Sequence, residues 1–326
     1  MDLSVYSAEN AINQFFAVHT CVTRQQCDDY ATHLVEGTVR PVAVQGSFSY
    51  TLTAGADQSK IIQFRAAGAD LDRGILDLAR QVHEQVVPPY TFHGLLCGKI
   101  PVYEMEKVSG IPYVKVKPVD PSSDTGPQHY TTVTDLAKFF ATSWNGRQHI
   151  DPDAIEAIRR DYQARIELLS RYLPDRFQKN LRMVREGLSL LFDKLYPFTL
   201  NHGDLSGLNV FVDPDTGHIT GILDWPEATI CPFGISLWGL ENFLGFMDGR
   251  GWHYYPNCDN LRSVFWQTFE LATGTLSHDE KHIIQIARMA GLFLRYGFTW
   301  ANGSQERVEE GTIAFRYLDA FCATGD

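Results

Sequence analysis

Hydrophobic residues recur at helical spacing near the start of the chain and then change to short alternating runs. Ala8, Ile12, Phe15 and Phe16 stand on one face of a helical projection, and the pattern continues to residue 35. From residue 39 the runs VRPVAVQGSFSYTLTAG and SKIIQFR predict two or three antiparallel strands, with Gly46 in a turn. A helix is expected over residues 70–87, where Pro88 and Pro89 end it, followed by strands in TFHGLL, KIPVYEME and IPYVKV.

Helical periodicity dominates after the Pro-, Ser- and Gly-rich segment PVDPSSDTGPQ. The helices are expected over residues 131–146, 152–172, 175–195, 259–274, 278–299 and 304–322. One β-rich island, residues 198–225, interrupts them, and its DPDTG turn predicts a hairpin of NVFVD with HITGILD. The chain is therefore expected to be α+β, with a β-rich domain over residues 1–107 and a larger helical domain over residues 108–326.

The amino-acid composition limits which classes of binding partner and which cellular location we expect. The chain has 326 residues, and its 28 basic and 39 acidic side chains give a net charge of −11, which argues against nucleic acid or an anionic membrane as a partner. Its longest apolar runs fall short of the roughly 18 residues that span a bilayer. The six cysteines form no CxxC pair, and the N-terminus lacks the pattern of a signal peptide. We expect a cytoplasmic monomer or homodimer.

The β-rich island also carries the polar residues with the clearest chemistry. His202, Gly203 and Asp204 are followed by Asn209, and Asp224 comes directly after the predicted hairpin. An aspartate on a loop can accept the proton of an attacking hydroxyl. The asparagine and the second aspartate, which the hairpin brings together, offer the hard oxygen ligands that Mg²⁺ prefers. This combination suits phosphoryl transfer, in which a metal neutralises charge on the transferred group.

The motif NHGDLSGLN…GILDWPEA resembles the signature of the aminoglycoside-phosphotransferase and choline-kinase-like family, which shares the protein-kinase fold. Further segments are also similar: VYEMEKVSG to the family's hinge, TDLAKFFATSW to its first large-lobe helix, and SLWGLENFLGFMDGRGWHYYPN to fungal members. The signature position at Leu223 departs conservatively. The resemblance implies a two-lobed fold and an ATP- and Mg²⁺-dependent enzyme that phosphorylates a hydroxyl group. It assigns the catalytic role to Asp204 and metal binding to Asn209 and Asp224. His202 is expected to hold the loop by hydrogen bonds.

The resemblance also places nucleotide-binding residues in the first lobe, with one departure. Gly46 and Ser47 lie where the family has a hairpin over the phosphates, although taken by itself this segment is typical of an ordinary hairpin. Alternation in KIIQFR puts Ile61, Gln63 and Arg65 on one face. Ile61 suits a contact with adenine, and Gln63 then stands where the family carries a phosphate-binding lysine. We expect Arg65 to supply the missing cation, the alternative being a surface ion pair.

The hinge and the acceptor side complete the expected site. Backbone groups around Glu104, Met105 and Lys107 would bind the adenine ring. After Asp224, carboxylates alternate with aromatic residues, which could bind an amine-bearing alcohol through charge and cation–π contacts. The residues expected there are Glu227, Glu241, Asp248 and Trp252. A surface loop over an aromatic core is the competing interpretation for each of them.

Two other functions remain open at this point. The glutamine at the lysine position is compatible with a kinase-like protein that binds a nucleotide or ligand without transferring phosphate. A metal hydrolase built on His202 would need further histidine ligands at suitable spacing, and the sequence around it offers none.

Overall fold

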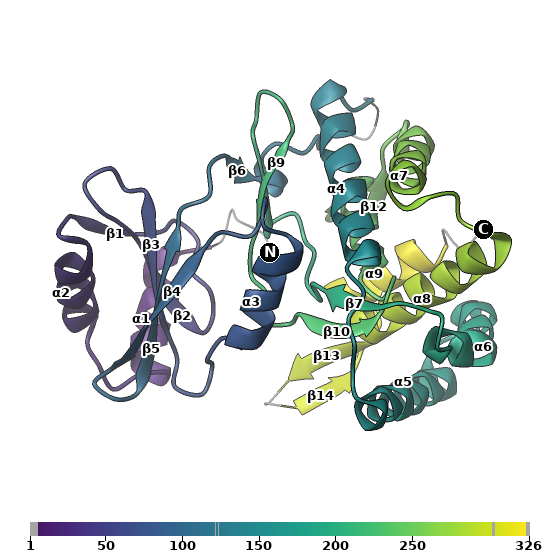
Figure 1. Ribbon diagram of the computed structural model, residues 1–326, viewed down its shortest axis with the longest axis horizontal. Helices are drawn as coiled ribbons and strands as arrows, with labels where there is room; N and C mark the ends of the chain where they lie inside the picture. The colour runs from purple at the N-terminus through teal and green to yellow at the C-terminus, as the bar shows by residue number, and fades with distance from the viewer. Residues whose placement is uncertain (1–5, 121, 123, 302–303, 324–326) are drawn as a thin grey trace. The chain divides into compact units, whose positions relative to one another are not determined.

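The computed structural model describes residues 6–120, 122, 124–301 and 304–323 (Figure 1). Contacts divide this chain into two compact units. Unit 1 contains the residues up to Leu76 together with Val87–Ser109, and unit 2 contains Asp77–Val86 and the residues from Gly110 onward. Residues 77–86, which belong to the predicted first domain, thus pack with unit 2. Two residues of the Pro-rich segment expected between the domains, 121 and 123, lie outside the described residues.

Unit 1 is an antiparallel sheet with two helices packed against it. Its strands follow the order β1-β2-β3-β5-β4. They are β1 (Val39–Pro41), β2 (Ser49–Ala54), β3 (Lys60–Arg65), β4 (Tyr90–Leu96) and β5 (Ile100–Glu106). The expected helical stretch over residues 7–35 forms two helices, α1 (Ala8–Val18) and α2 (Arg24–Val35). The break arises because Thr23 caps α2 in a capping box with Gln26.

Alternation along β3 fixes which side chains of unit 1 are buried. Ile62 and Phe64 are fully buried in the core with Phe15 of α1 and Ala31 of α2. The intervening residue Gln63 lies on the opposite face and is only partly buried. The predicted alternation is confirmed, and it sets the face on which polar side chains of this strand are available.

Unit 2 is mainly helical, and its helix starts agree with the sequence signals. Asp151 caps α5 ahead of a proline at the first helical position, and Ser277 caps α8 in a capping box with Glu280. The helices are α4 (Pro127–Asn145), α5 (Pro152–Tyr172), α6 (Gln178–Gly187), α7 (Cys258–Thr273), α8 (His278–Tyr296) and α9 (Ile313–Cys322). Helix α3 (Arg73–Val82) runs from unit 1 into unit 2. Short 3₁₀ helices are η1 (Tyr113–Lys115), η2 (Asp175–Phe177), η3 (Leu188–Phe192) and η4 (Leu237–Phe243).

The strands of unit 2 are more numerous than the sequence pattern indicated. The predicted hairpin is confirmed as β8 (Val210–Val212) with β9 (Ile219–Ile222), and β6 (Ile111–Pro112) adds a short third strand. Beyond it, three antiparallel pairs form: β7 (Phe198–Asn201) with β10 (Thr229–Pro232), β11 (Gly245–Asp248) with β12 (Gly251–Tyr254), and β13 (Phe298–Ala301) with β14 (Ser304–Arg307).

Four expected elements are wrong in their extent. The predicted helix over residues 278–299 ends at Tyr296, where β13 takes over, and most of the segment before α9 in the predicted helix 304–322 is β14 and a turn. The segment 175–195 is helical only as η2, α6 and η3 in succession. The strand expected in IPYVKV is limited to β6, because η1 follows at once.

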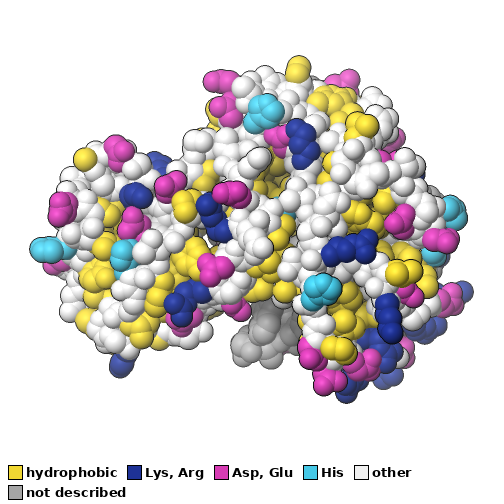
Figure 2. Space-filling view, in the orientation of Figure 1, with side chains coloured by type: hydrophobic (Ala, Val, Ile, Leu, Met, Phe, Trp, Pro, Cys, Tyr) yellow, Lys and Arg dark blue, Asp and Glu magenta, His cyan; other side chains and the backbone are white. Residues whose placement is uncertain are grey.

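The surface shown in the space-filling view carries acidic and basic side chains interspersed, without a field of one sign (Figure 2). Within the part of the chain that the structure describes, no helix has the length and apolar character needed to cross a bilayer.

Candidate active site

The loop between β7 and β8 carries the motif residues of unit 2, and a glycine determines its path. Gly203 has a φ of +80°, and a Cβ on it would lie 2.3 Å from the backbone oxygen of Glu227. Glycine alone fits such a position without strain. The close approach fixes Asp204, the next residue, beside the segment that leads into β10.

His202 organises this loop from the interior. Its Nε2–H donates to the carbonyl oxygen of Leu223 at 2.9 Å, and its Nδ1 accepts from the backbone N–H of Asp204 at 3.2 Å. Burial lowers the pKa of His202 to about 4, so the imidazole is neutral at physiological pH. The expectation that His202 holds the loop by hydrogen bonds is confirmed by these two contacts.

Asn209 connects Asp204 to the hairpin. Its side-chain N–H₂ group donates to Asp204 Oδ2 at 3.0 Å and to the Asp204 carbonyl at 2.8 Å. The backbone carbonyl of Asn209 accepts from the backbone N–H of Leu223 at 2.8 Å. Because Asp224 follows Leu223 directly, the structure brings Asp204, Asn209 and Asp224 together, as the sequence spacing suggested.

The oxygen atoms of Asn209 and Asp224 are suitable ligands for a hard divalent cation. The amide nitrogen of Asn209 is used by Asp204, and no hydrogen bond within the described residues uses its amide oxygen. Asp224 is exposed and has a φ of +68°, a left-handed conformation that is uncommon for aspartate and often found at functional sites. One amide oxygen and one carboxylate match the few protein ligands that Mg²⁺ takes when phosphate and water supply the others.

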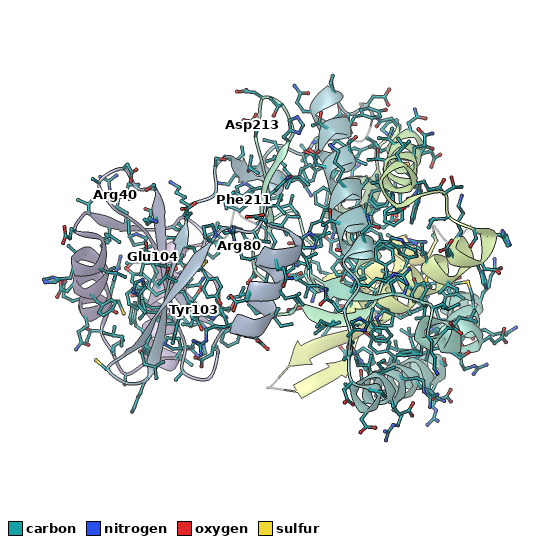
Figure 3. The ribbon with its side chains drawn as sticks, viewed as in Figure 1. Arg40, Arg80, Tyr103, Glu104, Phe211 and Asp213 are labelled. Carbon is teal, nitrogen blue, oxygen red and sulfur yellow. The ribbon has the colours of Figure 1, made fainter. Side chains whose placement is uncertain are left out.

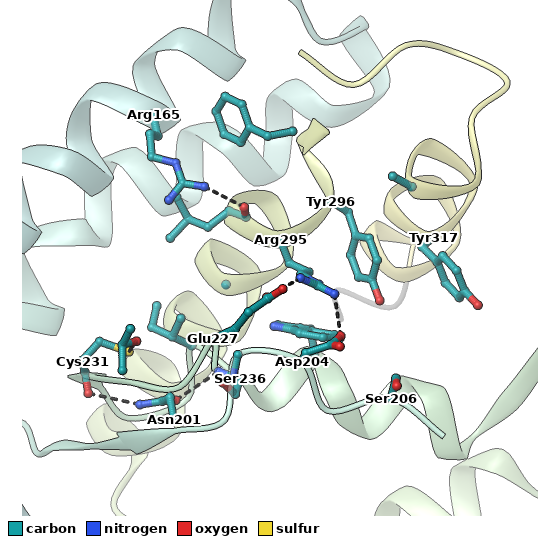
Figure 4. Close-up of a pocket in the computed structure, with 18 of the residues that line it drawn as sticks. Arg165, Asn201, Asp204, Ser206, Glu227, Cys231, Ser236, Arg295, Tyr296 and Tyr317 are labelled. Atoms are coloured by element: carbon teal, nitrogen blue, oxygen red, sulfur yellow. Dashed lines mark hydrogen bonds and ion pairs between the residues drawn. The ribbon is translucent and has the colours of Figure 1, made fainter. Parts of the chain in front are cut away.

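Arg295 is the charged residue at this site that the motif did not reveal. It belongs to the last turn of α8, and its two terminal nitrogens donate to Asp204 Oδ1 at 2.5 Å and to Glu227 Oε2 at 2.7 Å (Figure 4). The guanidinium also lies over the ring of Trp238, with 5.5 Å to the centroid. Partial burial raises the pKa of the Glu227 carboxyl, and Arg295 acts in the opposite direction. No local sequence pattern joins residue 295 to residue 204, so this contact could not be predicted from the sequence.

A cavity of about 560 Å³ opens beside Asp204 within unit 2. This volume is in the range of small-molecule sites. Aromatic side chains form much of its wall, and four charged residues line it. The charged residues are Arg165, Asp204, Glu227 and Arg295.

Of the four residues expected to bind the acceptor, Glu227 lines this cavity and the other three do not. Asp248 is an exposed residue at the turn between β11 and β12, where its Oδ1 accepts from the N–H groups of Arg250 and Gly251. Trp252 packs edge-on against Phe321, with ring centroids 4.9 Å apart. The aromatic-core interpretation therefore describes Trp252 better than a surface binding role.

Glu241 lies in a buried ionic cluster. It is fully buried and receives two hydrogen bonds from Arg262, at 2.7 and 3.0 Å, and one from Arg288 at 3.1 Å. The Tyr254 hydroxyl donates a fourth, at 3.1 Å. With these four donors, the carboxylate stabilises unit 2 and is not presented to a ligand.

In unit 1, the loop before β2 presents Gly46 and Ser47 as exposed residues. Its shape is set by Gln45, whose side chain accepts from the Thr51 N–H at 2.8 Å and donates to the Thr51 carbonyl at 2.9 Å. Gln45 is itself only 4% exposed. The loop is thus anchored at its base while Gly46 and Ser47 face solvent.

Gln63 and Arg65 contact each other on the same face of β3. Arg65 Nη1 donates to Gln63 Oε1 at 3.2 Å, and Arg65 Nε donates to the carbonyl of Ala69 at 2.6 Å. Ile61 precedes them on this face and is partly buried. The guanidinium therefore turns back toward position 63, where the resemblance expects a lysine.

The expected hinge residues follow in β5 and just after it. Glu104, labelled on β5 in Figure 3, pairs with Lys60 at 3.4 Å and His93 at 2.9 Å. The backbone N–H of Glu106 donates to Pro89 and that of Lys107 to Ser59. An adenine ring at this stretch would therefore have to use backbone groups other than the N–H groups of Glu106 and Lys107. Met105 is partly buried between its strand neighbours.

An antiparallel-sheet unit, a helical unit and an H-G-D…N loop followed by a hairpin and an aspartate together define a kinase-like phosphotransferase fold. A profile of the phosphotransferase enzyme family matches residues 38–252, well over half of the chain, and the protein belongs to that family. No curated protein matches the sequence significantly.

Two solved structures share the fold. The GDP complex of wild-type aminoglycoside 2'-phosphotransferase-IIIa aligns with a TM-score of 0.53 at 13% identity, covering 94% of this chain and 100% of that one. A macrolide 2'-phosphotransferase apoenzyme from Brachybacterium faecium gives the same TM-score and identity, covering 83% of this chain and 89% of that one. At this identity the likeness establishes the α+β kinase-like fold, which confirms the predicted fold class.

Proposed function

We propose that the protein transfers the γ-phosphoryl group of ATP, bound with Mg²⁺, to a hydroxyl group of a small molecule. The observation that carries this proposal is the hydrogen bond from Asn209 to Asp204, combined with the Leu223–Asn209 backbone bond that brings Asp224 to the same place. The proposed general base, Asp204, lines the cavity, and these bonds link it to the two proposed oxygen ligands of the metal.

In the proposed reaction, the acceptor oxygen forms a bond to the γ-phosphorus while the bond from that phosphorus to the bridging oxygen of ADP breaks. The hydroxyl proton passes to the Asp204 carboxylate. That carboxylate has about four lone-pair positions, of which Asn209 and Arg295 use one on each oxygen, so positions remain for the acceptor. Mg²⁺ held by Asn209 and Asp224 would neutralise phosphate charge when bound.

The test of this function compares Asp204→Asn with Asp213→Asn. Asp213 belongs to the turn of the β8–β9 hairpin, where it accepts from the N–H groups of Asp215 and Thr216, and it does not line the cavity. ADP release and mass-spectrometric detection of a phosphorylated product are measured over a panel of hydroxyl compounds. Asp204→Asn should lose turnover by orders of magnitude while Mg·ATP affinity by calorimetry is retained, and Asp213→Asn should behave as wild type. Wild-type turnover in Asp204→Asn would refute the assignment of the base.

Arg65 is proposed as the phosphate cation in place of lysine. Its contact with Gln63 supports this role, because the charge already lies beside position 63. A charge-assisted hydrogen bond is worth about 1.5–3 kcal/mol, so Arg65→Ala should weaken Mg·ATP binding by roughly ten- to a hundredfold. Gln63→Ala should weaken it much less. Near-wild-type affinity in both variants would remove Arg65 from the site. Because one fold relative is a GDP complex, GTP is titrated beside ATP.

A second candidate is a kinase-like protein that binds nucleotide without turnover, which Gln63 at the lysine position favours. Under this alternative, calorimetry detects nucleotide binding in the wild type, yet neither ADP nor phosphorylated product forms with any acceptor.

The remaining expectations stay predictions. They are a cytoplasmic location, a monomeric or homodimeric state, and a closer relation to choline kinases or fungal members. The expected amine on the acceptor rested on three carboxylates, and the structure pairs two of them, Glu227 and Glu241, with arginines of the chain.

A further inference from the structure

Arg295 occupies the part of the cavity that an acceptor hydroxyl must reach. Its guanidinium forms ion pairs with the two carboxylates of the cavity wall, Asp204 and Glu227. The guanidinium also makes a cation–π contact with the ring of Trp238. Its side chain retains 31% exposure, so it also faces the open space of the cavity. A positive charge therefore stands directly beside the proposed general base.

The charge balance of the cavity disfavours a cationic ligand. Among the described lining residues, Asp204 and Glu227 are matched by Arg295 and Arg165. The carboxylate nearest to Arg165 is Asp161, at 3.5 Å and outside the lining, and the Nε–H of Arg165 has no hydrogen-bond partner among the described residues. An ammonium group entering here would meet two guanidinium groups and no unpaired carboxylate. Asp224, which is near Glu227, is a ligand of the metal in the proposed function and would not bind the ammonium group.

The walls suit a flat, apolar ring. Tyr296 and Tyr317 stack with ring centroids 5.2 Å apart (Figure 4). The ring of Trp238 packs edge-on against that of Tyr296, with centroids 5.3 Å apart. Ile313, which also lines the cavity, is 60% exposed and adds an apolar side chain to its wall. Aromatic walls with a few polar groups at one end are typical of sites for ring-bearing small molecules.

We propose that the acceptor is an uncharged, ring-bearing alcohol and that Arg295 is the residue that excludes ammonium-bearing acceptors. This inference rests on the proposed function, because it assumes that the cavity receives the acceptor. A cation could reach Asp204 only by breaking both ion pairs of Arg295 or by lying against that guanidinium. An uncharged hydroxyl can instead accept from Arg295 and donate to Asp204 without displacing either.

The test measures binding without nucleotide, so that its outcome does not depend on turnover. The probes are aryl glycosides and aryl alcohols, each paired with an analogue in which one hydroxyl is replaced by an ammonium group. In the wild type, the neutral member of each pair should bind at least about tenfold more tightly than its amino partner. Arg295→Gln keeps a hydrogen-bond donor but removes the charge, and it should abolish or reverse that preference.

Arg160→Ala is the matched control. It removes one arginine from a surface ion pair with Glu156 on α5 and does not line the cavity, so the preference within each pair should persist. Thermal unfolding of Arg295→Gln checks that the variant is folded, and Arg295→Ala serves as a second charge deletion. The proposal is overturned if amino members bind as tightly as neutral members in the wild type, if both Arg295 variants keep the wild-type preference, or if no member of the panel binds at millimolar concentration. Phosphorylation of any acceptor is scored separately, so a loss of this inference leaves the proposed function standing.

Discussion

Replacing Glu241 by glutamine should destabilise unit 2 without affecting the binding of a ligand. Its carboxylate is fully buried and accepts three hydrogen bonds from Arg262 and Arg288 and one from Tyr254. In Glu241→Gln, the amide keeps one acceptor oxygen and turns an N–H₂ group toward guanidinium donors. Both arginines then lose the negative charge of Glu241 inside unit 2.

The magnitude follows from that loss. Removing one partner of a buried ion pair typically costs about 3–5 kcal/mol. The side chains of Arg262 and Arg288 retain 25% and 12% exposure and can recover part of their hydration, so we expect the lower end, about 3 kcal/mol. This is a large share of the roughly 5–15 kcal/mol that stabilises an ordinary domain.

Urea unfolding followed by both tryptophan fluorescence and circular dichroism measures the change, since a chain of two units need not unfold in a single step. Glu186→Gln is the control, because Glu186 is an exposed carboxylate of α6, and its unfolding midpoint should match the wild type. Residual folded Glu241→Gln should bind the acceptor with normal affinity. A midpoint equal to that of the wild type, together with weakened acceptor binding, would refute the structural role and restore Glu241 to the binding site.

Two further predictions concern stability and the catalytic loop. Burial lowers the pKa of His83 to about 3 and the pKa values of His129 and His202 to about 4. Below pH 6.5 the unfolded chain therefore takes up protons that the folded chain does not. The free energy of unfolding should fall as the pH drops from about 6.5 toward 4, by up to about 1.4 kcal/mol per pH unit for each histidine. Unfolding midpoints between pH 6.5 and 5 measure the slope, which should be shallower in His83→Gln, and a flat profile would contradict the burial of the three rings. Gly203→Ala should displace the loop and remove turnover, because the new Cβ would lie 2.3 Å from the Glu227 backbone oxygen. Gly249→Ala is the control: a Cβ there meets no atom within 4 Å, so ADP release and the thermal unfolding midpoint should equal those of the wild type.

The sequence predicted those parts of the molecule that depend on near neighbours in the chain. Asp204 and Asn209 lie on one loop, and the DPDTG turn closes the hairpin that returns Asp224 to them. The alternation of Ile62 and Phe64 with Gln63 likewise follows from strand geometry alone.

Contacts between residues far apart in the sequence could not be predicted from local sequence patterns. Arg295 reaches Asp204 across 91 positions, and Glu241 finds Arg262 and Arg288 on two later helices. A carboxylate among aromatic residues looks the same in sequence whether it faces a ligand or a buried arginine. The β11–β12 hairpin could have been found, since Asp248, Gly249 and Gly251 are residue types that favour turns, but the surrounding aromatic residues fit a helical core equally well.

Leu223 shows where the motif is free to vary. Both of its contacts in the site use the backbone: its N–H donates to Asn209, and its carbonyl accepts from His202. Any residue that keeps the β9 path can supply these two groups, so the departure from the family signature at this position carries no chemical cost. Sequence drift at 223 is therefore expected to be nearly neutral, whereas a change at 202 or 209 removes a side chain that the site itself uses. A search for related enzymes should weight these positions accordingly.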